Sequence, residues 1–158
     1  MPPSRAKLKT VKRLATLRGL WGWEGKKVVF TNGVFDILHA GHVTLLERAR
    51  GLGDVLIVGV NTDASARRLG KAPGRPINRL RDRAALLAAL SCVDAVVAFG
   101  EDTPEKILSV LKPDILVKGA DYAKGQIAGA RHAGRVVRVT LKAGYSTTGL
   151  IRRLQGLR

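Results

Sequence analysis

The sequence predicts an α/β protein with a Rossmann-like, doubly wound and mostly parallel sheet of five strands. Apolar stretches of strand length alternate along the chain with longer stretches of helical periodicity. The run Val55–Val60 is apolar without interruption, which is typical of a strand buried on both faces of a parallel sheet. Polar clusters follow four of the expected strands, and such sheets bind their ligands beyond the carboxyl ends of the strands.

An amphipathic helix is expected over residues 7–21, ahead of the first strand. Its apolar residues are mostly three or four positions apart, among lysines and arginines. Gly25 ends this segment. We therefore divide the chain into an N-terminal helical lead-in, residues 1–24, and a domain over residues 25–158.

The elements of the domain follow from apolar periodicity and from the residues that separate the apolar stretches. The polar stretch 61–78 contains two glycines and two prolines, so a short helix and a loop are expected there. Strands are expected at residues 27–30, 55–60, 95–99, 115–117 and 136–141. Helices are expected at about 40–50, at about 80–90, from Thr103 with Pro104 in the first turn, and from Ser146 or Thr147 to 154.

The formal net charge of +16 is the largest deviation in composition and by itself favours a nucleic-acid partner. The basic residues are nevertheless spread along the chain, and aromatic residues make up only 4% of it. No zinc-finger, helix-turn-helix or RNA-recognition signature is present. We therefore expect a solvated basic surface, part of which lines a phosphate pocket, rather than a nucleic-acid interface.

A cytoplasmic location is expected. The first residues lack the apolar stretch of a signal peptide, and no apolar run reaches transmembrane length. The single cysteine, Cys92, cannot form an intrachain disulfide. Its position just before an apolar strand favours a buried core residue over a nucleophile.

His39 and His42 stand three residues apart at the start of an expected helix. This spacing places both rings on one face of the helix N-terminus, where backbone N–H groups and the helix dipole attract an anion. Gly41 has no Cβ, so a phosphate can approach the backbone. The pattern predicts a nucleotide-phosphate site. The alternatives are a zinc site, for which only Cys92 and His132 remain as further ligands, or one ring in the core and the other in solvent.

The polar clusters at residues 31–42, 61–63, 118–121 and 144–148 each follow an expected strand. Because the carboxyl ends of parallel strands share one edge of a sheet, these clusters are expected to meet in one crevice. Lys118 is the expected cation for the phosphates there. The alternative is a lysine whose stem lies along the sheet edge with its ammonium group in solvent.

Further phosphate ligands are expected between the second and third strands. Arg75, Arg79 and Arg83 can each offer two parallel hydrogen bonds to a phosphate. Arg79 and Arg83 are four residues apart and share a helix face, although Arg79 is alternatively only solvated. Lys71 lies on the expected loop and either closes over a substrate or is an ordinary exposed lysine.

The segment His39–His42, preceded by Gly33–Asp36, resembles the His-x-Gly-His signature of the cytidylyltransferase-like nucleotidyltransferases, relatives of class I aminoacyl-tRNA synthetases. The resemblance extends from about residue 25 to 154. Further matching segments are Asn61–Asp63, Gly74–Asn78, Glu101–Pro104, Leu116–Tyr122 and Gly144–Thr148. Together they resemble the adenylyltransferase domain of the bifunctional heptose kinase/adenylyltransferases and their stand-alone counterparts.

The resemblance implies the nucleotidyltransferase fold of that superfamily. It implies transfer of AMP from ATP to D-glycero-D-manno-heptose 1-phosphate, which yields ADP-heptose and pyrophosphate for lipopolysaccharide core assembly. It also implies Mg²⁺, bound through the ATP phosphates, and Asp36 then either helps to hold this ion through water or orders the turn. A homo-oligomer is compatible with the sequence.

The expected roles divide into three groups. The catalytic residues are expected to be His39, His42, Lys118 and Arg83. Arg75 and Arg79 are expected to bind the substrate phosphate. The residues expected to bind the nucleotide are Thr31, Asn32, Gly33, Val34, Phe35, Asp36, Gly41, Asn61, Asp63, Lys71, Gly119, Asp121, Tyr145, Ser146, Thr147 and Thr148.

The sequence departs from the family pattern near the expected sugar site. Ala120 stands where the family usually has a second glycine, the segment 123–134 is shorter than usual, and Arg131 and His132 stand where acidic residues are common. The alternative substrates are therefore another sugar phosphate or a glycerol phosphate, with CTP in place of ATP. A basic nucleic-acid-binding module is the alternative from a different functional class.

Overall fold

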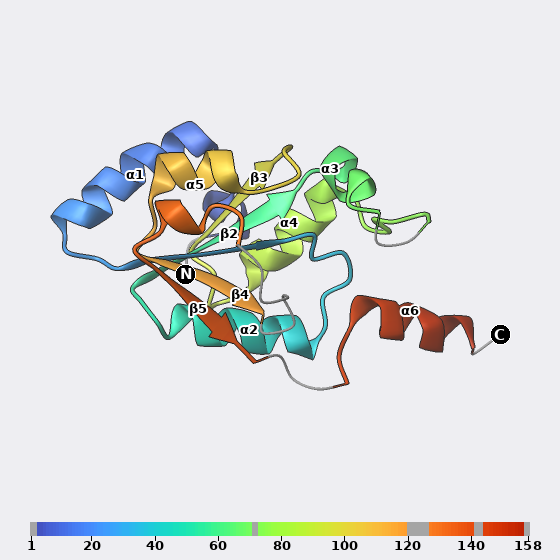
Figure 1. Cartoon of the computed structure of the whole chain (residues 1–158). Coiled ribbons are helices and arrows are strands. Elements are labelled where there is room, and N and C mark those ends of the chain that lie inside the picture. Colours follow the sequence, from blue (N-terminus) through green and yellow to red (C-terminus); the bar gives the residue numbers. More distant parts are fainter. Residues whose placement is uncertain (1–2, 71–72, 120–126, 141–143, 157–158) are drawn as a thin grey trace.

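The computed structural model describes residues 3–70, 73–119, 127–140 and 144–156. Five parallel strands form one sheet in the order β3-β2-β1-β4-β5, which confirms the predicted fold class (Figure 1). The strands are β1 (Val28–Gly33), β2 (Val55–Asn61), β3 (Ala95–Phe99), β4 (Ile115–Gly119) and β5 (Arg135–Val139). After β3 the chain crosses to the other side of β1, so β1 and β4 are neighbours where the strand order reverses.

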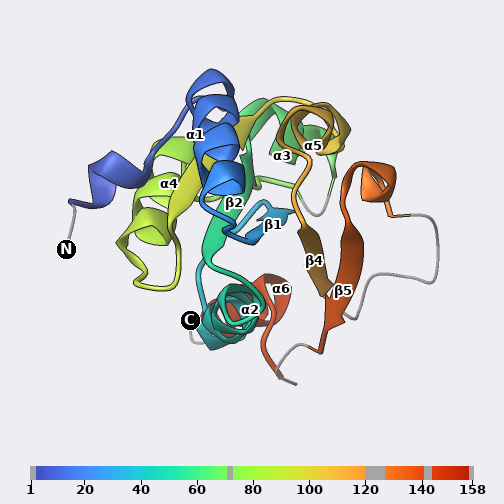
Figure 2. The same ribbon diagram turned by 90° about the vertical axis from the view of Figure 1, so that its left-hand side faces the viewer.

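Helices cover both faces of the sheet. Every residue of β2 and most residues of β1 and β4 are therefore buried. On one face, α2 (Ala40–Arg50) and α4 (Leu80–Ala89) contribute Leu46 and Leu87 to an apolar cluster. On the other face, α1 (Val11–Trp23) and α5 (Glu105–Leu111) pack together, and Leu14 is fully buried there (Figure 2). The lead-in helix therefore contributes to the core.

The short helix α3 (Asp63–Arg68) lies within the predicted polar stretch, and two 3₁₀ turns occupy Ser4–Lys7 and Ala130–His132. The last helix, α6 (Thr147–Gln155), extends to one side of the sheet, and none of its residues is buried (Figure 1). Its start matches the prediction, and the hydroxyl of Ser146 accepts a hydrogen bond from the N–H of Gly149 at 2.9 Å.

The prediction of a helix from residue 7 is wrong at its start. Lys7 ends a 3₁₀ turn, and Leu8 and Lys9 lie along the edge of β3, where the N–H of Lys9 donates to the carbonyl of Val96 at 2.9 Å. The ammonium group of Lys7 donates to the carbonyl of Leu90 at 2.8 Å. The helix begins only after Thr10, whose hydroxyl accepts from the N–H of Arg13. Pairing with a distant edge strand therefore outweighs the local apolar periodicity.

Other boundaries also differ from the predictions, among them the ends of β4 at Gly119 and of β5 at Val139. Thr103 does not cap α5, because the helix begins after Pro104 and has no side-chain cap. β1 continues to Gly33, three residues beyond the prediction, because it stays paired with β2 as far as Val60. Within the part of the chain that the structure describes, no helix is long and apolar enough to cross a membrane.

Candidate active site

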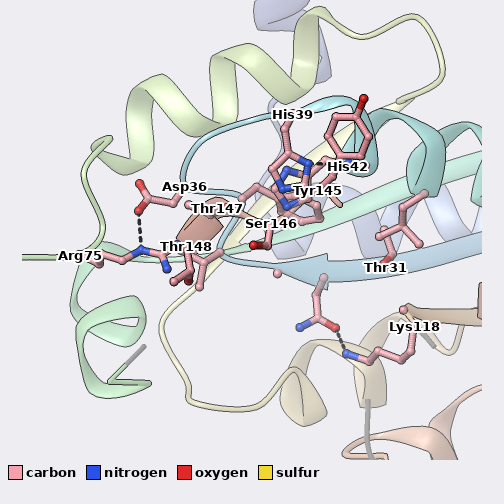
Figure 3. Close-up of a pocket in the computed structure, with 17 residues that line it drawn as sticks. Thr31, Asp36, His39, His42, Arg75, Lys118, Tyr145, Ser146, Thr147 and Thr148 are labelled. Carbon is pink, nitrogen blue, oxygen red and sulfur yellow. Dashed lines mark hydrogen bonds and ion pairs between the residues drawn. The ribbon is translucent and has the colours of Figure 1, made fainter. Parts of the chain in front are cut away.

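A pocket of about 340 Å³ opens at the carboxyl ends of β1 and β4, at the point where the strand order reverses (Figure 3). Five segments line it: the end of β1 and the loop after it, the start of α2, the loop before α4, the end of β4, and the start of α6 with the residues before it. The lining residues are Thr31, Asn32, Gly33, Val34, Phe35, Asp36, His39, Gly41, His42, Leu45, Arg75, Lys118, Gly119, Tyr145, Ser146, Thr147 and Thr148.

The two histidines stack on each other at the start of α2. Their ring centroids are 3.8 Å apart and their planes differ by 17°. His39 is the N-cap of α2, and its Nδ1 accepts a hydrogen bond from the backbone N–H of His42 at 3.3 Å. Since Nδ1 is an acceptor, a neutral His39 carries its proton on Nε2. Burial lowers the pKa of His39, which favours this neutral form.

Packing around the histidines joins three of the segments. Phe35, at a left-handed φ of 48°, places its ring edge-on to His42 at a centroid distance of 5.3 Å. A methyl group on Gly41 would lie 3.0 Å from Nδ1 of His39 and 3.0 Å from Cβ of Tyr145. Glycine at position 41 therefore lets Tyr145, in the segment before α6, pack against the start of α2, whereas a larger residue would require His39 or Tyr145 to shift.

Lys118 supplies a buried cation at the end of β4. Its residue is 5% exposed, and its ammonium group donates to the side-chain oxygen of Asn32 on β1. Burial lowers the pKa of Lys118 to about 8. The hydroxyl of Thr31 donates to the carbonyl of Val117 at 3.1 Å and links the same two strands. The alternative of an ammonium group in solvent is therefore wrong.

Asp36 and Arg75 form the second charged group in the pocket. Nε of Arg75 donates to Asp36 Oδ2 at 3.0 Å, and the two side chains are 10% and 0% exposed. Asp36 Oδ1 accepts from the backbone N–H groups of Ile77 and Asn78 at 2.8 and 2.9 Å. Burial alone would raise the pKa of Asp36, but the hydrogen bonds from Asn78, Ile77 and Arg75 outweigh it, so the pKa lies below its ordinary value.

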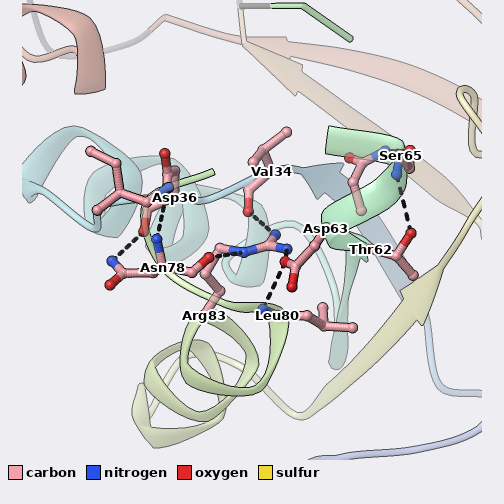
Figure 4. Close-up of polar contacts among 10 residues, drawn as sticks. Val34, Asp36, Thr62, Asp63, Ser65, Asn78, Leu80 and Arg83 are labelled. Atoms are coloured by element: carbon pink, nitrogen blue, oxygen red, sulfur yellow. Dashed lines mark hydrogen bonds and ion pairs between the residues drawn. The ribbon is translucent and has the colours of Figure 1, made fainter. Parts of the chain in front are cut away.

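Arg83 lies outside this pocket, contrary to its expected role as a phosphate ligand (Figure 4). Its side chain is fully buried, and all three nitrogens are in use. Nε donates to the carbonyl of Asn78 at 3.0 Å, and Nη1 to the carbonyl of Val34 at 2.6 Å. Nη2 pairs with Asp63 Oδ1 at 2.6 Å. Arg83 thus holds the backbone of the loop after β1 and does not line the pocket.

Three further expected residues also lie outside the lining of the pocket. Asn61 is buried, and its amide donates to Ser65 Oγ at 2.9 Å. Asp63 accepts from the N–H of Leu80 as well as from Arg83. Arg79 is exposed and is the residue before α4, so it does not share a helical face with Arg83. Lys71 and Asp121 fall outside the residues that the structure describes.

Sequence reasoning missed two residues. Leu45 lines the pocket one turn after His42, whereas the apolar periodicity of the helix indicated only a core position for it. Asn78 is the second: its amide donates to the carbonyl of Asp36 at 2.7 Å, in addition to its backbone contact with that carboxylate. The segment that contains Asn78 matched the family pattern, but nothing local indicated a contact with Asp36.

The pocket is suited to a polyanion. Histidines, one lysine, one arginine and the hydroxyl groups before and within the first turn of α6 line it. Its only carboxylate among the described residues is Asp36, which is already occupied by Arg75 and two backbone N–H groups. The fold and this site define an α/β protein with a pocket suited to a polyanion at the switch point of its parallel sheet.

Residues 30–153 match the family model described as cytidylyltransferase-like. The chain therefore belongs to the cytidylyltransferase-like family.

Curated relatives share high identity with the chain. Over 145 residues it is 57% identical to the bifunctional protein HldE of Mesorhizobium japonicum. This match covers 89% of the chain and 29% of that protein. Over 138 residues it is 55% identical to the bifunctional protein HldE of Magnetococcus marinus, and this match covers 85% of the chain and 28% of that protein. The chain thus spans less than a third of the length of these relatives.

Solved structures show the same fold. A lipopolysaccharide core biosynthesis protein from Thermoplasma volcanium is 33% identical, with a TM-score of 0.66 over 75% of this chain and 99% of that chain. A pantoate-beta-alanine ligase from Francisella tularensis, solved with beta-gamma ATP and beta-alanine, is 15% identical, with a TM-score of 0.57 over 94% and 76%. The second likeness concerns the fold alone.

Replacement of Arg83 by alanine is expected to lower the free energy of unfolding by about 3 kcal/mol, because it removes a fully buried guanidinium group, its ion pair with Asp63, and the donor of two carbonyls. Urea unfolding followed by circular dichroism measures the change. The matched control is Arg81→Ala on the same helix, where the side chain is 92% exposed and a change below about 0.5 kcal/mol is expected. Equal effects at the two positions would contradict the structural role of Arg83.

Proposed function

We propose that the chain transfers the adenylyl group of ATP to D-glycero-D-manno-heptose 1-phosphate, releasing pyrophosphate and giving ADP-heptose for lipopolysaccharide core synthesis. The observation that carries the proposal is the stacked pair His39 and His42 at the start of α2, facing one pocket with Lys118 and Arg75. The identity of 57% to a bifunctional protein HldE supports the choice of substrates. The likeness to a lipopolysaccharide core biosynthesis protein supports the same pathway.

The chemistry requires positioning and charge stabilisation more than proton transfer. A phosphate oxygen of the sugar attacks the α-phosphorus of ATP in line with the departing pyrophosphate. Because this nucleophile is already an anion near neutral pH, the reaction needs no general base. His39 and His42 act as hydrogen-bond donors to the triphosphate, while Lys118 and Arg75 neutralise charge that develops as the pyrophosphate leaves. The hydroxyl groups before and within the first turn of α6 complete the cradle.

Mg²⁺ fits this pocket as an ion carried by the nucleotide. The described residues include no group of three or more potential ligands among His, Cys, Asp and Glu. Asp36 accepts from Arg75, Ile77 and Asn78, so its carboxylate orders the loop. The ATP phosphates would hold the ion, which neutralises part of their charge when bound. We place the reaction in the cytoplasm, with ATP and a sugar 1-phosphate as the partners of the protein.

A pyrophosphate-release assay with paired substrates tests this function. ATP and CTP are each combined with heptose 1-phosphate and with glycerol 3-phosphate. Release is expected with ATP and heptose 1-phosphate, and at least about 100-fold more slowly with the other three pairs. A preference for CTP or for glycerol phosphate would replace the proposed substrates with those of a related transferase. Tight, salt-dependent binding of DNA without any turnover would instead favour the nucleic-acid alternative.

Loss of either imidazole is expected to lower turnover about 10²–10³-fold, as the loss of one preorganised donor usually does. His39→Asn is the informative variant at the first position, because asparagine is an equally good helix N-cap and removes only the ring. It should retain the unfolding midpoint of the unmodified protein, whereas His39→Ala should lower it. A rate near normal in a folded His42→Ala or His39→Asn variant would exclude the imidazole that the variant removes as a donor.

The pH profile is expected to report on Lys118. With a pKa of about 8, its ammonium form is present below that pH and is lost as the pH rises through it. The value of kcat/KM should therefore fall about tenfold per pH unit on the alkaline side. Bound phosphate favours the charged lysine, so the fall in kcat should occur at a higher pH. In Lys118→Arg, which stays charged, the fall near pH 8 should disappear, and its persistence there would assign it to another group.

A further inference from the structure

The loop at residues 73–78 is attached to the rest of the molecule mainly through Asp36. This carboxylate has no solvent exposure and accepts three hydrogen bonds from the loop: the side chain of Arg75 and the backbone N–H groups of Ile77 and Asn78. The carbonyl of Asp36 accepts a fourth, from the Asn78 amide. A single residue of the β1–α2 connection therefore sets the place of a loop about forty residues further along the chain.

Asp36 uses only one side of the Arg75 guanidinium group. The bond goes to Nε, and neither Nη1 nor Nη2 makes a hydrogen bond to another of the described residues. Arg75 lines the pocket, and in Figure 3 its pair with Asp36 lies on the other side of the drawn group from Lys118. The two terminal nitrogens are therefore the edge of the guanidinium group that a phosphate can bind with two parallel hydrogen bonds.

The contact restricts a side chain that would otherwise be flexible. An unpaired arginine on a loop adopts many rotamers, and binding of a phosphate would restrict it to one of them at a cost in conformational entropy. Asp36 restricts both the loop backbone and the guanidinium plane before any substrate arrives. An ionised Asp36 also lowers the charge repulsion between Arg75 and the other cationic groups of the pocket.

We propose that Asp36 is a positioning residue for the transfer reaction, one that presents the terminal nitrogens of Arg75 to a phosphate group in the pocket. The proposal deepens the proposed function and rests on it for the identity of that phosphate. The inferred orientation of Arg75 follows from the hydrogen bonds that Asp36 accepts and does not depend on the identity of the substrate. The same contacts assign Asp36 to the loop rather than to a magnesium ion.

A double-mutant cycle between Asp36 and Arg75 tests the proposal. Asp36→Asn retains an oxygen for the two backbone N–H groups but replaces the acceptor of Arg75 with an amide nitrogen. The affinity for inorganic pyrophosphate, measured by calorimetry, needs no knowledge of the sugar. We expect Asp36→Asn and Arg75→Ala each to weaken pyrophosphate binding about tenfold, and the double variant to bind within about twofold of Arg75→Ala.

The alternative is a residue that stabilises the fold without acting through Arg75. In that case Asp36→Asn lowers the unfolding midpoint but leaves pyrophosphate affinity unchanged, or the two losses multiply in the double variant; either result overturns the proposal. The matched control is the Asp102 and Arg68 pair, 2.7 Å apart, exposed, and outside the pocket lining. Asp102→Asn should leave pyrophosphate affinity unchanged.

Turnover measurements separate this proposal from the proposed function. If no substrate pair supports turnover but the cycle is non-additive, the function is wrong and the role of Asp36 holds. If turnover occurs and the cycle is additive, the reverse is true. If Asp36→Asn does not fold, Asp36→Glu replaces it in the double-mutant cycle with Arg75→Ala. This variant retains the charge but moves the carboxylate by one methylene group, and the same non-additive loss of pyrophosphate affinity is expected.

Discussion

Two buried charges hold the backbone that follows β1, and the pocket depends on them. Arg83 binds the carbonyl of Val34, and Asp36, two residues later, binds the loop at residues 75–78. Between these anchors Phe35 takes a left-handed conformation that costs on the order of 1 kcal/mol for a residue with a Cβ. The same conformation places its ring against His42. Without the anchors, the loop would have no reason to retain that backbone geometry.

The basic residues of the chain serve two distinct purposes around this site. Arg83 is buried against Asp63 and two carbonyls, where it stabilises structure. Lys118 and Arg75 line the pocket, and they are the only lysine and arginine among the described residues that do so. The net charge of +16 therefore has little to do with the pocket itself, and most of it lies on the surface. Charge counted along a sequence does not distinguish these purposes, but burial and hydrogen-bond partners do.

Periodic signals in the sequence predicted the fold class and most elements, because a strand buried on both faces and a capped amphipathic helix each leave a local pattern. The meeting of β1, α2, β4 and α6 at one edge followed from the parallel topology. The misassigned residues depend on distant partners. Arg83 differs from Arg79 because Val34, Asp63 and Asn78 surround it, and Leu8 and Lys9 lie along β3 because Val96 accepts from Lys9. No local spacing encodes such contacts.

The site also has to tolerate its own positive charge before a substrate binds. Two stacked imidazoles 3.8 Å apart, a buried lysine and an arginine would repel one another strongly if all were charged. Capping of α2 through Nδ1 favours a neutral His39, Asn32 accepts from Lys118, and Asp36 neutralises Arg75. In the proposed reaction, an entering triphosphate would meet a neutral His39 and an Arg75 whose charge Asp36 balances. The negative charge of the triphosphate would then favour the protonated form of Lys118 still further, so the pocket would be most cationic with the polyanion bound.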